Sequence, residues 1–489
     1  MKPKQSVSTN FIFNFLNQIL SVVVPCITVP YLARTLGPAG IGEYSFALSL
    51  VTYFASFTNL GVNLYGQRQI AYLKNENKEV YSKAFWELVL LRVCLGVISS
   101  VAYFILIVRI SDSYLLSALL TLEILNMILD IQWLFQGFEN FRIITIRNFI
   151  VKTVTMLAIF IFVKSSSDVA IYALIMSAGN LVGFASMWLV LRYYIVKVSF
   201  NKLHMFSHLK GAWALYLPQV AIQVYTVLDK TMLGIITKSN IENGYYEQAN
   251  KVVLVLLMGV TALSTVMVPR ISAMFAAKDQ EQINRYLGKS FSYVWLVGFP
   301  ITFGIFAVAD IFVPFFFGVG YEPVIRLLCL FSLIIIPIGI SNIIGLQYLV
   351  TTGNEYYLTK SVVLGAIVNF GLNMLFIRWW QATGATLASV IAEVVITVFQ
   401  LWVVRDFLPV VNYMKSMKNY LVAAIVMYVA LILMPIYFDK AIVLLMSKVI
   451  LGSIVYLVCL LGMKDSFFRE IISKINEMIS KKKARDRVK

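Results

Sequence analysis

Histidine and closely paired cysteine are scarce in this sequence, and their scarcity argues against several kinds of chemistry. The only two histidines, His204 and His208, lie in a basic loop between apolar stretches, so no histidine-based metal site or Ser-His relay is expected within a membrane. The cysteines fall in separate apolar stretches, which suggests neither a disulfide framework nor a zinc site. They are Cys26, Cys94, Cys329 and Cys459. We therefore expect no metal and no cofactor.

Charged residues are also few, at 13% of the chain against 60% hydrophobic residues. This balance excludes a disordered chain and argues against a soluble domain. Because a bilayer-spanning helix needs roughly 20 apolar residues, the 489 residues could supply about a dozen spans, with little left for a soluble catalytic domain. ATP hydrolysis is not expected either, because Ile283 stands where a phosphate-binding loop ending at Gly288-Lys289-Ser290 would need glycine.

The apolar runs predict an all-α polytopic membrane protein with fourteen transmembrane helices. The runs are separated by charged residues or by glycine and proline. The expected spans are approximately 10–36, 40–64, 84–108, 113–137, 142–164, 168–192, 209–237, 243–269, 286–309, 323–350, 356–378, 382–404, 417–438 and 441–463.

The distribution of basic residues predicts the orientation and accounts for the net charge of +17 without nucleic acid as a partner. Lysine and arginine accumulate in cytoplasmic loops. With the N-terminus inside, the inner segments hold 29 of the 41 basic residues, the outer loops hold six and the spans hold six. We expect a multi-pass protein of the cytoplasmic membrane with both termini cytoplasmic. The first apolar stretch has no small-residue cleavage site and should remain as the first helix.

An internal repeat divides the chain. Residues 42–47 (GEYSFA) recur as 244–249 (GYYEQA), an offset of 202 residues. An offset of six helices implies parallel repeats related by an axis along the membrane normal. We expect a six-helix lobe at 1–205, a second at 206–410, two additional helices at 411–463 and a basic amphipathic cytoplasmic tail at 464–489, which suits an anionic inner leaflet.

The same offset aligns two polar stripes. Each stripe has spacings of three, four or seven residues and therefore lies on one helix face. The first consists of Asn17, Ser21 and Thr28, and the second of Gln219, Gln223, Thr226 and Lys230. Amides in hydrocarbon must face protein or water, so the two stripes suggest a shared central cavity. Hydrogen bonding between helices, with no solute involved, is the alternative.

Two segments of the sequence, one in each expected lobe, carry a recognisable pattern. The first is 34–44 (RTLGPAGIGEY) with Gly61 and Arg68, and the second comprises 229–230 (DK), 244–246 (GYY) and 249–251 (ANK). Together they resemble the polysaccharide flippases of the Wzx type. The resemblance implies the fold of the multidrug and oligosaccharidyl-lipid exporters (MATE-like), with two lobes that rock around a cavity. It also implies an undecaprenyl-pyrophosphate-linked oligosaccharide as cargo, for capsule, O-antigen or exopolysaccharide. Membrane lipids, the polysaccharide polymerase and the chain-length machinery are the other partners expected of such a protein.

Charged residues inside the predicted spans of the first lobe are costly and should be paired or functional. Arg92, Asp130 and Lys152 lie at similar depth from the inner side by helix rise, so we expect one network. Glu123 and Asn126 share the face of Asp130. A buried structural ion network is one interpretation, and a cavity-lining cluster that contacts sugar hydroxyls or pyrophosphate is the other.

The second lobe offers further charges. Asp229 could pair with Lys251, or Glu247 could pair with Lys251 at i, i+4 and free Asp229 to hold Lys230 or a coupling cation. Lys230 could equally form a salt bridge to Asp229 or Glu247 that supports its helix. Glu393 lies near the midplane of its span, where its protonation could couple to transport, unless it snorkels or bonds a neighbouring helix.

These residues form the candidate site, in which lysine and arginine compensate a pyrophosphate that dehydrates at great cost. The substrate-binding candidates are Arg92, Lys152, Asn17, Gln219, Gln223, Lys230 and Lys251, and the ion-coupling candidates are Glu123, Asp130, Asp229 and Glu393. A lipid-linked oligosaccharide flippase is the first hypothesis, and a cation-coupled small-molecule or drug antiporter of the same fold is the second. A polymerase or glycosyltransferase is least favoured, because the outer loops are short and no Asp-x-Asp occurs.

Overall fold

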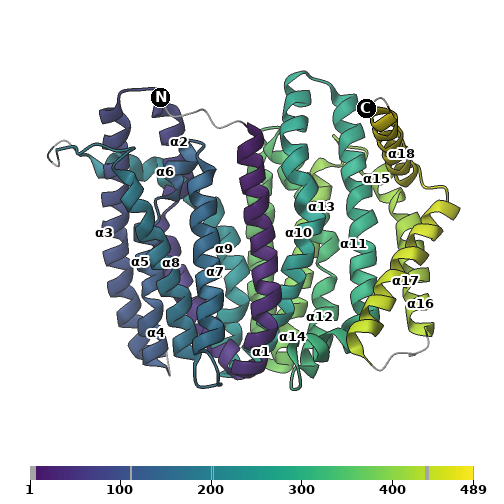
Figure 1. The fold of residues 1–489 in the computed structure, drawn as a ribbon, viewed down its shortest axis with the longest axis horizontal. Helices are drawn as coiled ribbons and strands as arrows, with labels where there is room; N and C mark the ends of the chain where they lie inside the picture. Colours follow the sequence, from purple (N-terminus) through teal and green to yellow (C-terminus); the bar gives the residue numbers. More distant parts are fainter. Residues whose placement is uncertain (1–6, 111–112, 200, 202, 435–439, 488–489) are drawn as a thin grey trace. The chain divides into compact units, whose positions relative to one another are not determined.

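The computed structural model describes residues 7–110, 113–199, 201, 203–434 and 440–487, and every regular element among them is helical. By their contacts the residues separate into two compact units, Met1–Glu247 and Gln248–Lys489. Within each unit the long helices run roughly alongside one another (Figure 1). The division into lobes at residue 205 stays a prediction.

The first unit contains the helices from α1 to the start of α10. Their bounds are α1 Val7–Asn59, α2 Val62–Leu73, α3 Lys78–Ile110, α4 Tyr114–Leu120, α5 Leu122–Leu129, α6 Gln132–Gly137, α7 Phe141–Phe162, α8 Val169–Leu191, η2 Met205–His208, α9 Leu209–Thr237 and α10 Asn240–Ala276. The helix α1 contacts α3, α5, α7 and α9.

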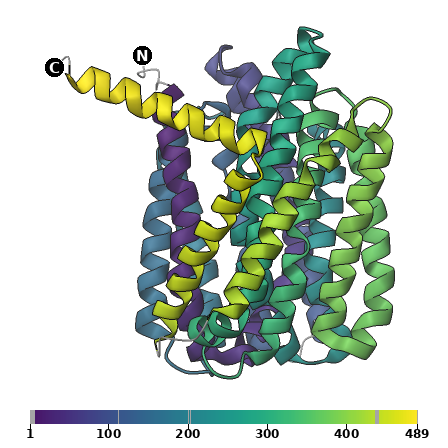
Figure 2. The same ribbon diagram turned by 90° about the vertical axis from the view of Figure 1, so that its right-hand side faces the viewer.

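The second unit continues α10 to the C-terminal helix. Its elements are α11 Gln280–Phe317, α12 Glu322–Ser332, α13 Ile335–Asn342, η3 Ile343–Val350, α14 Glu355–Val404, α15 Val410–Lys415, α16 Met417–Leu433, α17 Ala441–Gly462 and α18 Ser466–Arg487. Here α11 packs against α12, α16 and α17. In Figure 2 the last helix, α18, turns sharply away from the direction of α17.

The expected all-helical membrane fold is confirmed. Among the described residues, eleven helical segments are long and apolar enough to cross a membrane. Large apolar side chains also cover much of the outer surface, including Leu189 and Leu433, each 74% exposed, as lipid-facing positions require.

Two of the long helices are each interrupted by one residue with positive φ. Gly37 in α1 has a φ of 68°, a conformation that glycine adopts without steric cost, and Gln381 in α14 has a φ of 49°. Both residues fall between pairs of spans expected from the sequence, at 36/40 and 378/382. The two parts of α14 are close neighbours, because a Cβ added at Gly365 would lie 2.4 Å from the Ile396 side chain. The count of fourteen crossings stays a prediction.

The expected span 113–137 is not one continuous helix. It is divided into α4, α5 and α6, and the main break lies at Asp130, whose ψ of 104° is extended rather than helical. A break of this kind frees backbone groups that must find partners where water is excluded. Those partners identify one part of the candidate site.

Candidate functional site

The two repeat segments of the sequence meet within the first unit. A Cβ added to Gly42 would lie 1.6 Å from the backbone oxygen of Asn240, and a Cβ added to Gly244 would lie 1.9 Å from the backbone oxygen of Pro38. Pro38 and Asn240 differ by the same 202 residues as Gly42 and Gly244, so the two contacts are reciprocal. Only glycine at both positions lets α1 and α10 approach this closely.

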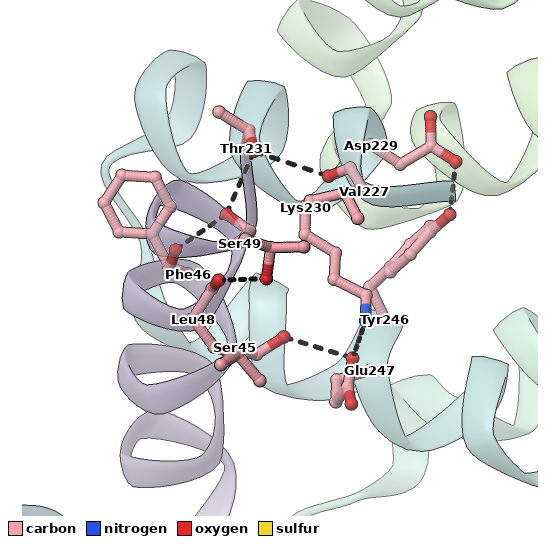
Figure 3. A network of polar contacts seen from close by, with 11 residues as sticks. Ser45, Phe46, Leu48, Ser49, Val227, Asp229, Lys230, Thr231, Tyr246 and Glu247 are labelled. Atoms are coloured by element: carbon pink, nitrogen blue, oxygen red, sulfur yellow. Dashed lines mark hydrogen bonds and ion pairs between the residues drawn. The ribbon is translucent and has the colours of Figure 1, made fainter. Parts of the chain in front are cut away.

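A charged cluster lies one helical turn further along the same two helices (Figure 3). The Ser45 hydroxyl donates to Oε2 of Glu247 at 3.1 Å, and these residues are again 202 apart. The Lys230 ammonium on α9 lies 2.5 Å from the same carboxylate oxygen, with the side chains of Lys230 and Glu247 only 20% and 11% exposed. One carboxylate therefore binds both α1 and α9.

Polar contacts continue along α9 on either side of Lys230. The Tyr246 hydroxyl donates a short hydrogen bond to the carboxylate of Asp229, which is 4% exposed. Thr231 donates to the Ser49 hydroxyl at 2.9 Å and lies 3.2 Å from the Tyr53 hydroxyl. Figure 3 shows Asp229 and Thr231 on opposite sides of Lys230, so neighbouring residues of α9 face different helices.

The second-lobe expectations can be compared with these contacts. Of the two salt bridges considered for Lys230, the structure contains the one to Glu247. Lys251 is half-buried on α10, and Glu393 is 9% exposed on α14. The Gln223 amide lies 3.5 Å from the Thr52 backbone oxygen.

Some positions of the polar stripes cannot be compared in this way. The side chains of Asn17, Ser21 and Gln219 lie outside the described residues. A role for any member of the two stripes in binding substrate stays a prediction.

Among the described residues of the first unit, Arg92 on α3 is the most deeply buried cation, at 1% exposure. Its guanidinium donates to the side-chain oxygens of Asn59 at 2.9 Å and Asn63 at 2.7 Å. It also donates a short hydrogen bond to the backbone oxygen of Asp130. Arg92 thus ties α1 and α2 to the interrupted helix.

Asp130 itself caps the break. Its Oδ1 accepts from the backbone nitrogen of Gln132 at 2.9 Å, and its Oδ2 accepts from the Asn63 amide at 3.4 Å. Its backbone oxygen accepts a second bond, from the Trp133 indole at 3.1 Å. The break is stabilised because the freed carbonyl of Asp130 has two donors and its carboxylate accepts from the backbone nitrogen of Gln132, the first residue of α6.

The expected meeting of Arg92 with Asp130 is therefore confirmed, although the guanidinium contact is to the backbone oxygen. Lys152 lies on α7, where it is half-buried, and its membership of this network stays a prediction. Glu123 binds α8 by accepting from the Ser177 hydroxyl at 2.7 Å, and it accepts from Asn126 at 3.2 Å.

Ser45, Asn59 and Asn63 are among the participants that were not expected from the sequence. Ser45 could have been found, because the repeat offset places it opposite Glu247. Asn59 and Asn63 are four residues apart, but Gly61 between them ends one helix and begins the next, so helix periodicity gave no reason to join them to Arg92.

The arrangement provides buried cations and hydrogen-bonding groups rather than reactive ones. No group of three or more histidine, cysteine, aspartate or glutamate residues within the described ranges is placed to hold a metal ion. Cationic side chains in a site of low dielectric attract anionic groups strongly.

Comparisons with known proteins identify the family and the fold. Residues 7–275 match the model of the family described as "Polysaccharide biosynthesis protein". The chain is 25% identical over 414 residues to a "Putative O-antigen transporter" of Escherichia coli (strain K12), covering 82% of this chain and 98% of that protein. It is 23% identical over 401 residues to a protein of the same name from Shigella dysenteriae, covering 81% and 99%.

Solved structures show the same fold. The structure titled "Lipid II flippase MurJ, inward closed conformation" aligns with a TM-score of 0.73 at 16% identity, covering 95% of this chain and 99% of that one. An inward-facing multidrug resistance transporter of the MATE family aligns with a TM-score of 0.62 at 14% identity, covering 81% and 99%. The expected MATE-like fold is confirmed. Because the family model covers more than half of its residues, the chain belongs to the polysaccharide biosynthesis protein family.

Proposed function

We propose that this protein is a flippase that moves an undecaprenyl-pyrophosphate-linked oligosaccharide across the cytoplasmic membrane, for capsule, O-antigen or exopolysaccharide assembly. The observation that carries the proposal is the family match, together with nearly full-length alignment to proteins named as O-antigen transporters. The fold shared with a structure titled as a lipid II flippase supports it.

The proposed mechanism is alternating access without covalent chemistry. The reciprocal glycine contact and the Ser45–Glu247–Lys230 cluster lie near the interruption of α1 at Gly37, the end of α9 and the start of α10, which the predicted topology places outside. We infer that these contacts close the outer end in this conformation and separate when the cargo leaves. Because only a few contacts hold the outer end closed, the free-energy difference between the closed and open conformations is small. A transporter needs such a small difference, since it must populate both conformations.

The charged residues receive proposed roles on the same basis. Cations would compensate the pyrophosphate, amides would bind sugar hydroxyls, and buried carboxylates would exchange protons or hold a coupling cation. The cations are Arg92, Lys152, Lys230 and Lys251, the amides Asn17, Gln219 and Gln223, and the carboxylates Glu123, Asp130, Asp229 and Glu393. Burial of Arg92, Asp130 and Asp229 supports roles that depend on exclusion of water.

Orientation and partners complete the proposal. Both termini would be cytoplasmic, and the polymerase and chain-length machinery would receive the exported units. A drug antiporter remains the second candidate, because the fold alone is shared with a multidrug transporter. The family match favours the flippase, since it is specific to polysaccharide biosynthesis.

Deletion of the gene in its own host tests the proposal. We expect loss of one surface polysaccharide and accumulation of its lipid-linked repeat unit on the cytoplasmic side, both reversed by the wild-type gene. Drug sensitivity without either change would favour the antiporter. Unchanged polysaccharide and unchanged drug sensitivity would contradict both functions.

A further inference from the structure

A groove of about 910 Å³ lies in the second unit, between the two parts of α14 and the end of η3. None of the candidate site residues lines it. Its lining combines tyrosine and tryptophan rings with aliphatic side chains and three charged residues, Lys360, Arg405 and Asp406. A groove with this mixture of groups is suited to an amphipathic molecule rather than to a soluble one.

The charged and aromatic residues gather at the helix ends. Lys360 lies in the second turn of the first part of α14, with its ammonium 4.4 Å from the centre of the Tyr356 ring. Arg405 follows the last residue of α14, with its guanidinium carbon 5.3 Å from the centre of the Trp402 ring. Tyrosine and tryptophan in such positions are typical of the membrane–water interface.

The groove becomes apolar with depth. Val363, Ile367 and Phe399 line it further along α14. Ile367 lies twelve residues after Glu355, the first residue of α14, which is about 18 Å at 1.5 Å per residue. That length is close to the thickness of one hydrocarbon leaflet, about half of 30 Å. The groove therefore offers a polar mouth at the interface and, from Val363 onwards, an apolar wall that reaches about one leaflet below the start of α14.

The charge at the mouth favours an anionic head group. Asp406 neutralises part of the positive charge, since its Oδ1 lies 3.6 Å from Nε of Arg405, and the lining keeps a net charge of +1 from Lys360, Arg405 and Asp406. The proposed topology places this mouth at the cytoplasmic leaflet, where anionic phospholipids concentrate. The polyprenyl chain of the proposed cargo is much longer than the groove, so the groove does not match that lipid.

We propose that this groove binds one anionic glycerophospholipid, with its head-group phosphate between Lys360 and Arg405 and an acyl chain along Val363, Ile367 and Phe399. This is a resident lipid site, separate from transport of the cargo. The two cations act as point charges on the phosphate, so binding should weaken with salt and with loss of either charge.

Binding of phosphatidylglycerol to the full-length protein in detergent tests the proposal, by native mass spectrometry and by the rise in melting temperature. Phosphatidylcholine with the same acyl chains is the neutral comparison. We expect tight binding of one phosphatidylglycerol and at least about tenfold weaker binding in the Lys360→Gln/Arg405→Gln variant, since each charge near a lipid surface contributes roughly 1 kcal/mol. The matched control Arg285→Gln/Lys415→Gln removes one arginine and one lysine outside the groove and should keep full binding.

A second variant separates loss of binding from loss of folding. Ile367→Trp keeps both charges but fills the apolar wall, and it should also lower phosphatidylglycerol occupancy. Equal binding of the two phospholipids by the wild type, or undiminished phosphatidylglycerol binding by both groove variants, would overturn the proposal. Displacement of phosphatidylglycerol by equimolar undecaprenyl phosphate would overturn it as well, because the groove would then belong to the cargo.

Discussion

Lys230 could stabilise the structure or bind the cargo, and its contact with Glu247 allows the two roles to be separated by substitution. The two side chains are only 20% and 11% exposed, so removing Lys230 alone leaves a largely buried carboxylate without this partner. We expect Lys230→Gln to lower the unfolding free energy by about 1–3 kcal/mol, and Lys230→Gln/Glu247→Gln to recover most of that loss. Thermal unfolding in detergent measures both.

Surface polysaccharide supplies the second measurement on the same variants. If the charge of Lys230 attracts the cargo, the double variant accumulates in the membrane but exports nothing, whereas Lys230→Arg retains much of the activity because the charge persists. Export restored by the double variant would show that the salt bridge, rather than the cation, is what transport requires.

Arg92 and Asp130 should respond differently to substitution, because the guanidinium binds a backbone oxygen of Asp130. Arg92→Lys replaces the planar guanidinium, whose nitrogens bind Asn59, Asn63 and the helix break together, by a single ammonium group. We expect the free energy of unfolding to fall by about 2 kcal/mol or more. Asp130→Asn keeps an oxygen for the Gln132 backbone nitrogen and should cost less than about 1 kcal/mol. Equal losses in thermal unfolding would indicate that the Asp130 charge itself holds Arg92.

Contacts between residues were predictable from the sequence only where they depend on the depth of each residue in the membrane. Helix rise placed Arg92 and Asp130 at one depth, and they meet. The sequence could not show that the bond goes to a carbonyl, because that depends on the extended ψ of Asp130 inside an apolar run. Which acid holds Lys230 was equally open, since Asp229 and Glu247 both lie within reach by sequence and only packing orients them.

At the scale of elements, the close approach of α1 and α10 depends on glycine. Gly244→Ala would place a Cβ 1.9 Å from the Pro38 backbone oxygen, and a backbone atom cannot move aside as a side chain can. We expect the free energy of unfolding to fall by about 2 kcal/mol or more, and less of the variant protein to accumulate in the membrane. Gly259→Ala on the same helix is the matched control, because nothing lies within 4 Å of its added Cβ. A similar fall in melting temperature for both would mean that backbone flexibility, rather than contact, is what α10 needs.

The helix α18 is attached to the second unit by Glu470. Its carboxylate lies 2.5 Å from the Lys289 ammonium on α11 and 2.7 Å from that of Lys474, and these hydrogen bonds lower the pKa of Glu470 from 4.5 to about 2. A lowered pKa stabilises the folded state above pH 4.5 and loses that effect as the pH falls towards 2. We therefore expect attachment of α18 to be constant from about pH 5 to 8.

Substitution tests the same attachment. Glu470→Gln should speed amide exchange across α18 by roughly two- to fivefold, as expected for a partly exposed ion pair. The control Glu477→Gln removes an exposed acid of the same helix and should leave exchange unchanged. Equal exchange rates in the two variants would show that apolar contacts alone hold α18.

At the scale of the whole molecule, length and apolar patterning made the fold predictable. The expected spans 142–164 and 441–463 differ from α7 and α17 by at most two residues at each end, because charged residues, glycine or polar loops mark those ends. The interruptions of 113–137 and 323–350 were not predictable. Both runs are predominantly apolar, so hydropathy alone gives no sign of a break, and the break at Asp130 is stabilised by a partner distant in sequence, Arg92.

The orientation of the chain is the remaining expectation for the whole molecule. The excess of lysine and arginine on one side predicts cytoplasmic termini, with Lys238 outside and Lys464 inside. Lys238 is the C-cap residue of α9, and Lys464 lies between α17 and α18. Both residues are therefore at helix ends, where a label should not disturb packing. In a variant without the four native cysteines, we expect Lys238→Cys to react with a membrane-impermeant maleimide in intact cells and Lys464→Cys to react only after permeabilisation. The opposite pattern would invert the topology and move the proposed lipid groove to the outer leaflet. Reaction of both residues in intact cells would require an even number of crossings between Lys238 and Lys464, in place of the seven that the expected spans give.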